Sequence, residues 1–261
     1  MGRFVRAVAI VALIFVATPT LIVVVSSFSA GQELTFPPRS ISVDPYVSML
    51  RSSDIRTALE RSLTVGALSV VFSLFAGVLA AMALFRHRVK FRSVMTGYLM
   101  LGFSTPLVVS GMAFLVLFIR VGLLGRLWPM ALAITIVNFP LLIFAVASSI
   151  SNLNPELEEA AATLGAEGVQ TFLFVTLPGI MPGVLTGSIM MFVFGMTEFL
   201  ISLILSTVAN QTLPVLMFGS LRGAVTPILA AVGGVYILIA LIVVFLISRL
   251  RSLEDFLHSP E

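Results

Sequence analysis

Cysteine is absent from this 261-residue chain, and lysine occurs only once, at Lys90. Without cysteine there are no disulfides and no thiolate that could act as a nucleophile or a metal ligand. A phosphate-binding P-loop needs a Gly-Lys-Ser/Thr sequence, which the chain also lacks, so any ATP it uses must be hydrolysed by another protein. The two histidines, His87 and His258, lie far apart in the sequence, and we predict neither a metal site nor a cofactor.

Charged residues are also scarce, at 10% of the chain, whereas hydrophobic residues make up 59%. Polar side chains this rare cannot cover a soluble domain, so we predict an integral membrane protein. The net charge of +3 is small and its cations are scattered, which argues against nucleic acid as a partner. The apolar segments contain no nucleophile with a base and no paired carboxylates, so the chain is not expected to be an enzyme.

Six apolar segments are long enough to cross a bilayer as helices, and their approximate bounds are 4–27, 57–85, 95–118, 127–148, 178–205 and 227–248. We therefore predict an all-α membrane protein in which residues 1–261 form a single transmembrane domain. Ser104-Thr105-Pro106 predicts a kink in the third segment. Asn138 and Pro140 are expected to interrupt the fourth segment.

Arginine and lysine crowd the segment ends that we place in the cytoplasm. Eight lie on that side and seven outside, so their position rather than their number sets the orientation; the eight are Arg3, Arg6, Arg86, Arg88, Lys90, Arg92, Arg249 and Arg251. Six spans then put both termini inside. The first apolar segment is longer than the apolar part of a usual signal peptide, so we expect it to be retained as a helix.

A polar loop at about 149–177 separates the fourth and fifth segments, with four carboxylates and no cation. Asn154 and Pro155 predict a helix start there, and Gly165 predicts its end in a left-handed conformation. A second helix, about 169–176, is expected to end at Leu177-Pro178, because proline cannot continue the backbone hydrogen bonds. The alanine-rich surface of the first helix permits close approach of another surface and predicts a docking site.

The pattern Glu159-Ala160-Ala161, then Gly165, Val175 and Leu177-Pro178, resembles the cytoplasmic "EAA" loop of the membrane subunits of ABC importers that use a substrate-binding protein. Order and spacing match throughout, with valine at 175 where isoleucine is common. The resemblance implies that the coupling contact to the ATPase is made by Glu159, Ala160, Ala161, Gly165, Leu177 and Pro178.

The same resemblance implies the other parts of the machine. The chain would be a non-catalytic permease subunit in a bacterial cytoplasmic (inner) membrane. It would work with two copies of an ATP-binding cassette subunit, a second permease subunit that we expect to be homologous, and an external substrate-binding protein. Transport would proceed by alternating access, in which discrete packings of the helix bundle open the pathway to one side at a time.

Glu198 is the one acidic residue that we place inside a span, and Thr197 and Asn138 are its candidate polar neighbours. Thr197-Glu198-Phe199, followed by Gln211-Thr212-Leu213-Pro214, resembles the polyamine-type branch of these permeases. That resemblance implies a small cationic, amine-containing solute attracted by Glu198. Met196-Thr197-Glu198 departs from the branch, where a second acidic residue is often adjacent.

Other readings of Glu198 and of the solute stay open. As a structural residue, Glu198 would pair with Arg120, Arg126 or Arg222, or would be protonated and hydrogen-bonded. Opines, aminophosphonates or other small organic compounds are alternative solutes for the same class of importer. A channel or membrane scaffold without ATPase coupling is a further alternative.

The fifth apolar segment opens with glycines at four-residue spacing, at Gly179, Gly183 and Gly187. This spacing puts them on one helix face and predicts close contact with a neighbouring helix. Glycine is also simply common in membrane helices, which is the alternative explanation.

Overall fold

The computed structural model describes residues 3–31, 33–86, 89–221, 223 and 226–258, the side chains of 3, 244 and 247–258 excepted. His87, Arg88 and Arg222 therefore lie outside the described residues, as do the side chains of Arg3, Arg249, Arg251 and His258. Within the described part the chain is all-α, as predicted, with a single isolated β-bridge between Ser29 and Ile41. A helix satisfies its own backbone hydrogen bonds, which a segment surrounded by lipid requires.

The helices form two compact units, Met1–Leu59 with Leu213–Val244, and Glu60–Thr212 with Phe245–Glu261. The first unit contains α1 (Arg3–Ser26), α2 (Asp44–Arg51), the start of α3 (Ser53–Ala81), α11 (Leu213–Leu221) and the first part of α12 (Pro227–His258). Its core is built from Met49, Ala58, Leu213, Ala231 and Val232.

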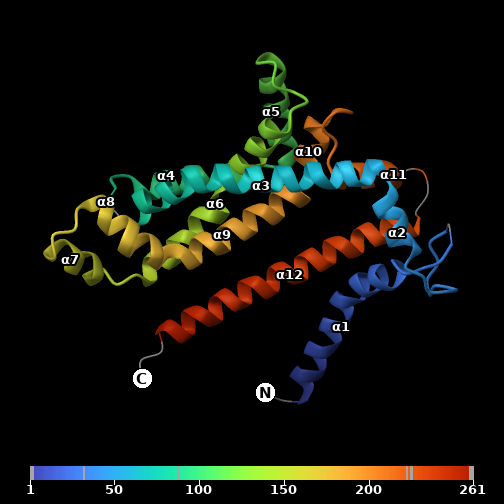
Figure 1. The fold of residues 1–261 in the computed structure, drawn as a ribbon, viewed down its shortest axis with the longest axis horizontal. Coiled ribbons are helices and arrows are strands. Elements are labelled where there is room, and N and C mark those ends of the chain that lie inside the picture. Colours follow the sequence, from blue (N-terminus) through green and yellow to red (C-terminus); the bar gives the residue numbers. More distant parts are fainter. Residues whose placement is uncertain (1–2, 32, 87–88, 222, 224–225, 259–261) are drawn as a thin grey trace. The chain divides into compact units, whose positions relative to one another are not determined.

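The second unit holds the polar loop at about 149–177, with its predicted coupling role, and is organised around α6 (Leu127–Asn152) (Figure 1). After the rest of α3 come the π-helical turn η1 (Met82–Arg86), α4 (Arg92–Ser104) and α5 (Leu107–Arg120). After α6 come α7 (Glu156–Thr163), α8 (Gly168–Thr171), a second π-helical turn η2 (Phe172–Thr176), α9 (Leu177–Thr197) and α10 (Leu200–Leu205). Helix α6 packs against α4, α5, α9, α10 and η1, and more than half of its residues are buried.

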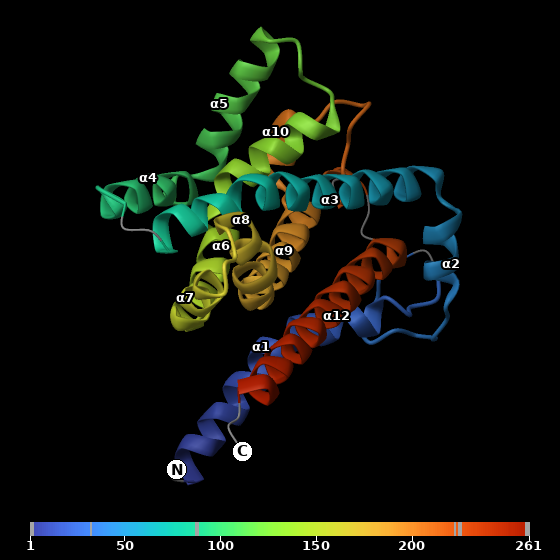
Figure 2. The same cartoon turned by 60° about the vertical axis from the view of Figure 1, so that its left-hand side comes forward.

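Helices α6 and α9 lie side by side along most of their length (Figure 2). The predicted glycine face makes this possible. A Cβ added at Gly183 would lie 2.5 Å from the Ala145 carbonyl oxygen, and one at Gly187 would lie 3.0 Å from the Leu142 Cα. Because any side chain at these points would push the helices apart, the prediction of close packing is confirmed.

Pro140 does not interrupt α6, contrary to the sequence-based expectation. The helix runs unbroken from Leu127 to Asn152, with Pro140 buried inside it. The Asn138 side chain stays on its own helix, where its amide donates to the Ile134 carbonyl at 3.0 Å. Packing by surrounding helices holds the proline in place, as is common in membrane proteins.

The third predicted segment is broken rather than kinked. Helix α4 ends at Ser104, α5 begins at Leu107, and the two axes differ by 92°. The Thr105 hydroxyl donates to the Leu101 carbonyl at 2.6 Å, which satisfies an acceptor at the end of α4. Such a pair is either one broken span or a re-entrant loop.

In the part of the chain that the structure describes, four helices are long and apolar enough to cross a membrane: 4–26, 53–86, 127–152 and 168–197. The bent pair α4–α5 would make a fifth, and the apolar part of α12 covers Pro227–Val243 within the described residues. The count of six spans remains a prediction.

Candidate functional site

The start and end of α7 follow from local capping. The Asn154 Oδ1 atom accepts the Glu156 N–H at 3.0 Å, which satisfies one of the free donors at the helix start. At the other end Gly165 has φ +87°, as predicted. The Gly165 N–H donates to the Ala162 carbonyl and the Ala166 N–H to the Ala161 carbonyl, each at 3.0 Å. This is the hydrogen-bond pattern of a Schellman motif, which closes the helix.

The second helix of the loop does not end at Leu177-Pro178, and this expectation was wrong. Residues 168–197 form one continuous helix, in which η2 joins α8 to α9 and Pro178 is the second residue of α9. A π turn is wider than an α turn and changes which carbonyl each donor would reach. The proline, which has no N–H, therefore follows this turn without breaking the helix.

Most of the predicted coupling residues face outward. Glu159, Ala160, Gly165 and Pro178 are exposed, while Ala161 and Leu177 are half-buried. Large apolar side chains of the same loop are also exposed, namely Leu164 (90%), Phe174 (78%) and Val169 (70%). Exposed apolar side chains on an otherwise polar loop are typical of a surface that binds another protein.

The inner side of α7 carries an ion pair that the sequence analysis did not foresee. Glu158 Oε2 accepts hydrogen bonds from Arg86 Nε at 2.9 Å and Arg86 Nη2 at 2.5 Å, and Glu158 Oε1 accepts the Thr176 hydroxyl at 2.6 Å. Arg86 ends η1, and Thr176 ends η2. One signal pointed this way: the loop has four carboxylates and no cation, so a partner had to come from another segment.

Glu198 lies at a break in the fifth predicted segment, between α9 and α10. Its side chain is buried, and its two carboxylate oxygens accept the N–H groups of Ile201 and Ser202, each at 3.0 Å. The carboxylate therefore caps the N-terminus of α10. Within the described residues no ion pair joins it to Arg120 or Arg126, and Arg222 lies outside them.

The two candidate neighbours of Glu198 hydrogen-bond to their own helices. The Thr197 hydroxyl donates to the Val193 carbonyl at 2.7 Å, and the Asn138 amide donates within α6. The structure thus gives no hydrogen bond between these three side chains in the described part of the chain. Their role in the solute pathway remains a hypothesis.

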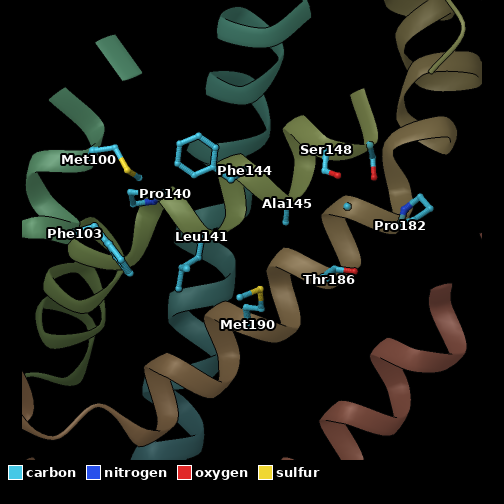
Figure 3. Close-up of a pocket in the computed structure, with 12 residues that line it drawn as sticks. Met100, Phe103, Pro140, Leu141, Phe144, Ala145, Ser148, Pro182, Thr186 and Met190 are labelled. Carbon is cyan, nitrogen blue, oxygen red and sulfur yellow. The ribbon is translucent and has the colours of Figure 1, made fainter. Parts of the chain in front are cut away.

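A cavity of about 410 Å³ lies between α4, α6 and α9 (Figure 3). Phe103 and Met100 line it from α4, and Met190 lines it from α9. Its polar lining comes from the hydroxyl groups of Ser148, Ser149 and Thr186, with no charged side chain. Such a lining offers aromatic faces, thioethers and hydrogen-bonding oxygens to a small molecule.

Known proteins similar to this chain are transport subunits. Residues 73–253 match the family described as "Binding-protein-dependent transport system inner membrane component". The chain is 24% identical over 247 residues to the spermidine/putrescine transport system permease protein PotC of Escherichia coli K12, covering 94% of this chain and 92% of PotC. It is 30% identical over 226 residues to the putrescine permease protein PotI of the same strain, covering 82% and 78%.

Two further similarities widen the comparison. The sulfate transport system permease protein CysW of Synechococcus elongatus is 29% identical over 218 residues, covering 75% of this chain and 76% of CysW. A crystal structure of a bacterial ABC transporter involved in the import of the acidic polysaccharide alginate has the same fold, with a TM-score of 0.69, 18% identity, and coverage of 95% of this chain and 98% of that one. This chain belongs to the family of inner-membrane components of binding-protein-dependent transport systems: it is a non-catalytic permease subunit of an ABC importer, similar to the polyamine-type permeases, and a partner ATPase hydrolyses the ATP.

Proposed function

We propose that this permease receives a small amine-containing cation, of the polyamine type, from an external binding protein and passes it inward by alternating access. It would act beside a second, homologous permease subunit and two copies of the ATPase. The exposed side of α7, with Glu159 and Ala160, would form the contact with the ATPase, together with Gly165 and Pro178.

The observation that carries this proposal is the construction of the loop. Helix α7 is a separate short helix whose outer side is exposed, although it lies between two long membrane helices. Helix α8 continues through η2 into α9 without a break, so a displacement of the loop would act directly on a helix of the bundle. A docking surface connected in this way can transmit the motion of an ATPase to the transport pathway.

The contact between α6 and α9 supports discrete rather than gradual movement. Glycines at 183 and 187 bring the α9 backbone against α6. Helices α3 and α9 are equally close, because a Cβ added at Gly66 of α3 would lie 2.9 Å from the Phe192 carbonyl oxygen of α9. Tightly packed surfaces exchange between distinct arrangements because intermediate ones create voids or overlaps.

The solute proposal rests on the relatives and on the cavity of Figure 3. An alkylammonium group binds to aromatic faces and hydroxyl oxygens, and its methylene groups contact apolar side chains. The lining by Phe103, Thr186 and Met190 fits these requirements without a fixed charge that would hold the cation too tightly. A similar relative is a sulfate permease, so an anionic or zwitterionic solute is the competing expectation.

Docking is tested by purifying the tagged chain from its own cells and measuring the ATPase that comes with it. We expect Glu159→Lys to abolish co-purification while the chain remains in the membrane. Glu60→Lys, the same charge reversal at another exposed carboxylate, is the matched control and should retain the ATPase. Equal recovery of the ATPase with Glu159→Lys would remove α7 as the docking surface. Failure of any ATPase to co-purify with the wild-type chain would contradict the coupling proposal as a whole.

The solute is tested by uptake of radiolabelled putrescine into cells that lack the chromosomal copy of this chain. Uptake should return with the wild-type chain and be inhibited by excess spermidine. If putrescine uptake does not return, the same cells are tested with a radiolabelled opine, 2-aminoethylphosphonate and sulfate. Restored uptake of an opine or of 2-aminoethylphosphonate would assign one of the alternative solutes, and restored uptake of sulfate would contradict the cation proposal.

A further inference from the structure

Glu158 connects three parts of the second unit through one side chain. It projects from the inner side of α7, and its two oxygens are bonded to Arg86 at the end of η1 and to Thr176 at the end of η2. The side chains of Arg86 and Glu158 are only 17% and 22% exposed, and Thr176 is buried. Water therefore screens this ion pair less than it would screen a fully exposed one.

Arg86 and Thr176, the partners of Glu158 within the described residues, are each the last residue of a π-helical turn. The turns η1 (Met82–Arg86) and η2 (Phe172–Thr176) are each five residues long and lie on different membrane helices. A π turn is a rare departure from the α-helix and is found frequently at functional sites. Two such turns that end on the same carboxylate indicate that the position of Glu158 is held by a dedicated arrangement.

The arrangement joins α7 to two membrane helices at once. Arg86 is the last residue of the continuous helix 53–86, which contains α3, and Thr176 immediately precedes α9. Farther along, α3 and α9 are in close contact, because a Cβ added at Gly195 would lie 2.9 Å from the Gly66 Cα. A displacement of α7 would thus reach both helices, whereas the chain itself connects α7 only to α6 and α8.

We propose that Arg86, Glu158 and Thr176 form a clamp that makes α3 and α9 move together with α7. The proposal rests on the docking function proposed above and assigns these three side chains a positioning role in coupling. Arginine suits the role because its guanidinium is always charged and holds a carboxylate with two directed hydrogen bonds. The outer side of α7 would contact the ATPase, and the inner side would transmit the movement.

The test uses the complete importer in proteoliposomes, with the ATPase and binding protein that purify with the wild-type chain. Putrescine import and ATP hydrolysis are measured together for Arg86→Gln, Glu158→Gln and Thr176→Val. We expect the ATPase to remain bound and ATP to be hydrolysed, while import per ATP falls at least about fivefold, the lower end of typical coupling between sites. Glu167→Gln, which neutralises another carboxylate of the same loop but keeps its capping acceptor, should match the wild type.

Two further measurements separate a clamp from a merely stabilising ion pair. The exchange Arg86→Glu with Glu158→Arg should recover part of the import per ATP that each single change loses.

The second measurement is the distance between α7 and α3. Because the chain has no cysteine, spin labels can be placed at Ala162 on α7 and Leu79 on α3. Their separation should stay constant between the ATP and ADP–vanadate states in the wild type and change between these states with Arg86→Gln.

The outcomes are distinct. If the ATPase co-purifies with the wild-type chain but the three variants import as much per ATP as the wild type, the clamp is excluded and the docking function stands. A constant label separation in the Arg86→Gln variant would exclude the clamp in the same way. Absence of the ATPase from the wild-type preparation would instead remove the docking function on which the clamp rests.

Discussion

Glu198 stabilises the helix that follows it, because its buried carboxylate accepts two backbone N–H groups at the start of α10. These donors lie at the positive end of the helix, where a negative charge is favourable. Within the described residues, this capping role accounts for a buried acidic side chain that has no ion pair there.

We expect Glu198→Gln to lower stability, because the amide keeps one acceptor and loses both the second acceptor and the charge. The loss should be about 1–2 kcal/mol, the range for a weakened helix cap. It can be measured as a lower thermal unfolding midpoint of the detergent-purified chain. Thr197→Ala is the neighbouring control, since the exposed Thr197 hydroxyl bonds only to its own helix. A wild-type midpoint together with lost uptake of putrescine would assign Glu198 to the solute instead.

Gly165 closes α7 in a conformation that other residues adopt only at a cost, since its φ is +87°. We expect Gly165→Ala to destabilise the loop by about 1–2 kcal/mol, the cost of the left-handed region for a residue with a Cβ. Gly165→Asn should cost less, because asparagine tolerates this region better.

The readout for Gly165 is hydrogen exchange of the α7 amides in the purified chain, which should speed up in the order wild type, Asn, Ala. Gly168→Ala serves as the control, because Gly168 has an ordinary φ and open space around an added Cβ. Equal exchange in Gly165→Ala and Gly168→Ala would show that the left-handed conformation does not hold α7 closed.

The residues that could be predicted from the sequence are those whose structure is local. Asn154 and Gly165 set the ends of α7 through hydrogen bonds between residues no more than five positions apart. The residue types at these two positions were therefore enough to indicate both caps. Glu158 and Arg86 are 72 positions apart, and the π turns that bring them together have no recognisable sequence pattern. The sequence indicated that Glu198 is an acidic residue inside an apolar segment, but it did not predict the helix break between α9 and α10.

At the scale of the element, α9 shows what glycine spacing and proline each determine. The four-residue spacing of Gly179, Gly183 and Gly187 indicated the packed face correctly, because steric contact depends only on helix geometry. Pro178 and Pro140 were expected to end or interrupt helices, and both lie within them. Proline weakens an isolated helix, but packing against other helices, or a wide turn nearby, compensates.

The contact between α6 and α9 yields a prediction of its own. Gly183→Ala should destabilise the chain by about 1–3 kcal/mol, the typical cost of an extra methyl group in a packed interior. The added Cβ would lie 2.5 Å from the Ala145 backbone oxygen and 2.6 Å from Ser149 Oγ, and the backbone oxygen cannot move aside.

Thermal unfolding of the detergent-purified chain measures this effect. Gly219→Ala is the matched control, since Gly219 also lies in a helix and has nothing within 4 Å of an added Cβ. It should leave the midpoint unchanged or raise it, because alanine favours the helix over glycine. A midpoint for Gly183→Ala that equals that of Gly219→Ala would mean that α6 and α9 separate at no cost.

At the scale of the whole molecule, the ion pair between Arg86 and Glu158 bears on orientation. It puts the turn between α3 and α4 on the same side of the membrane as α7. That turn also contains Lys90, and Arg92, the first residue of α4, lies over the Phe85 ring at 4.5 Å. Cations at helix ends are typical of the cytoplasmic side, so the structure and the charge pattern together favour a cytoplasmic coupling loop.

Orientation can be tested because the chain has no cysteine of its own. Ile41 is 80% exposed in the polar stretch that we place outside, and Gly168 is exposed at the start of α8 with open space around an added Cβ. In intact cells an impermeant thiol reagent should label Ile41→Cys and not Gly168→Cys, because the bilayer separates the charged reagent from the cytoplasm. After permeabilisation both should react, which proves that the second thiol is accessible. Labelling of both positions in intact cells would place α8, and with it the docking surface of α7, outside the membrane, where no ATP-hydrolysing subunit could reach it.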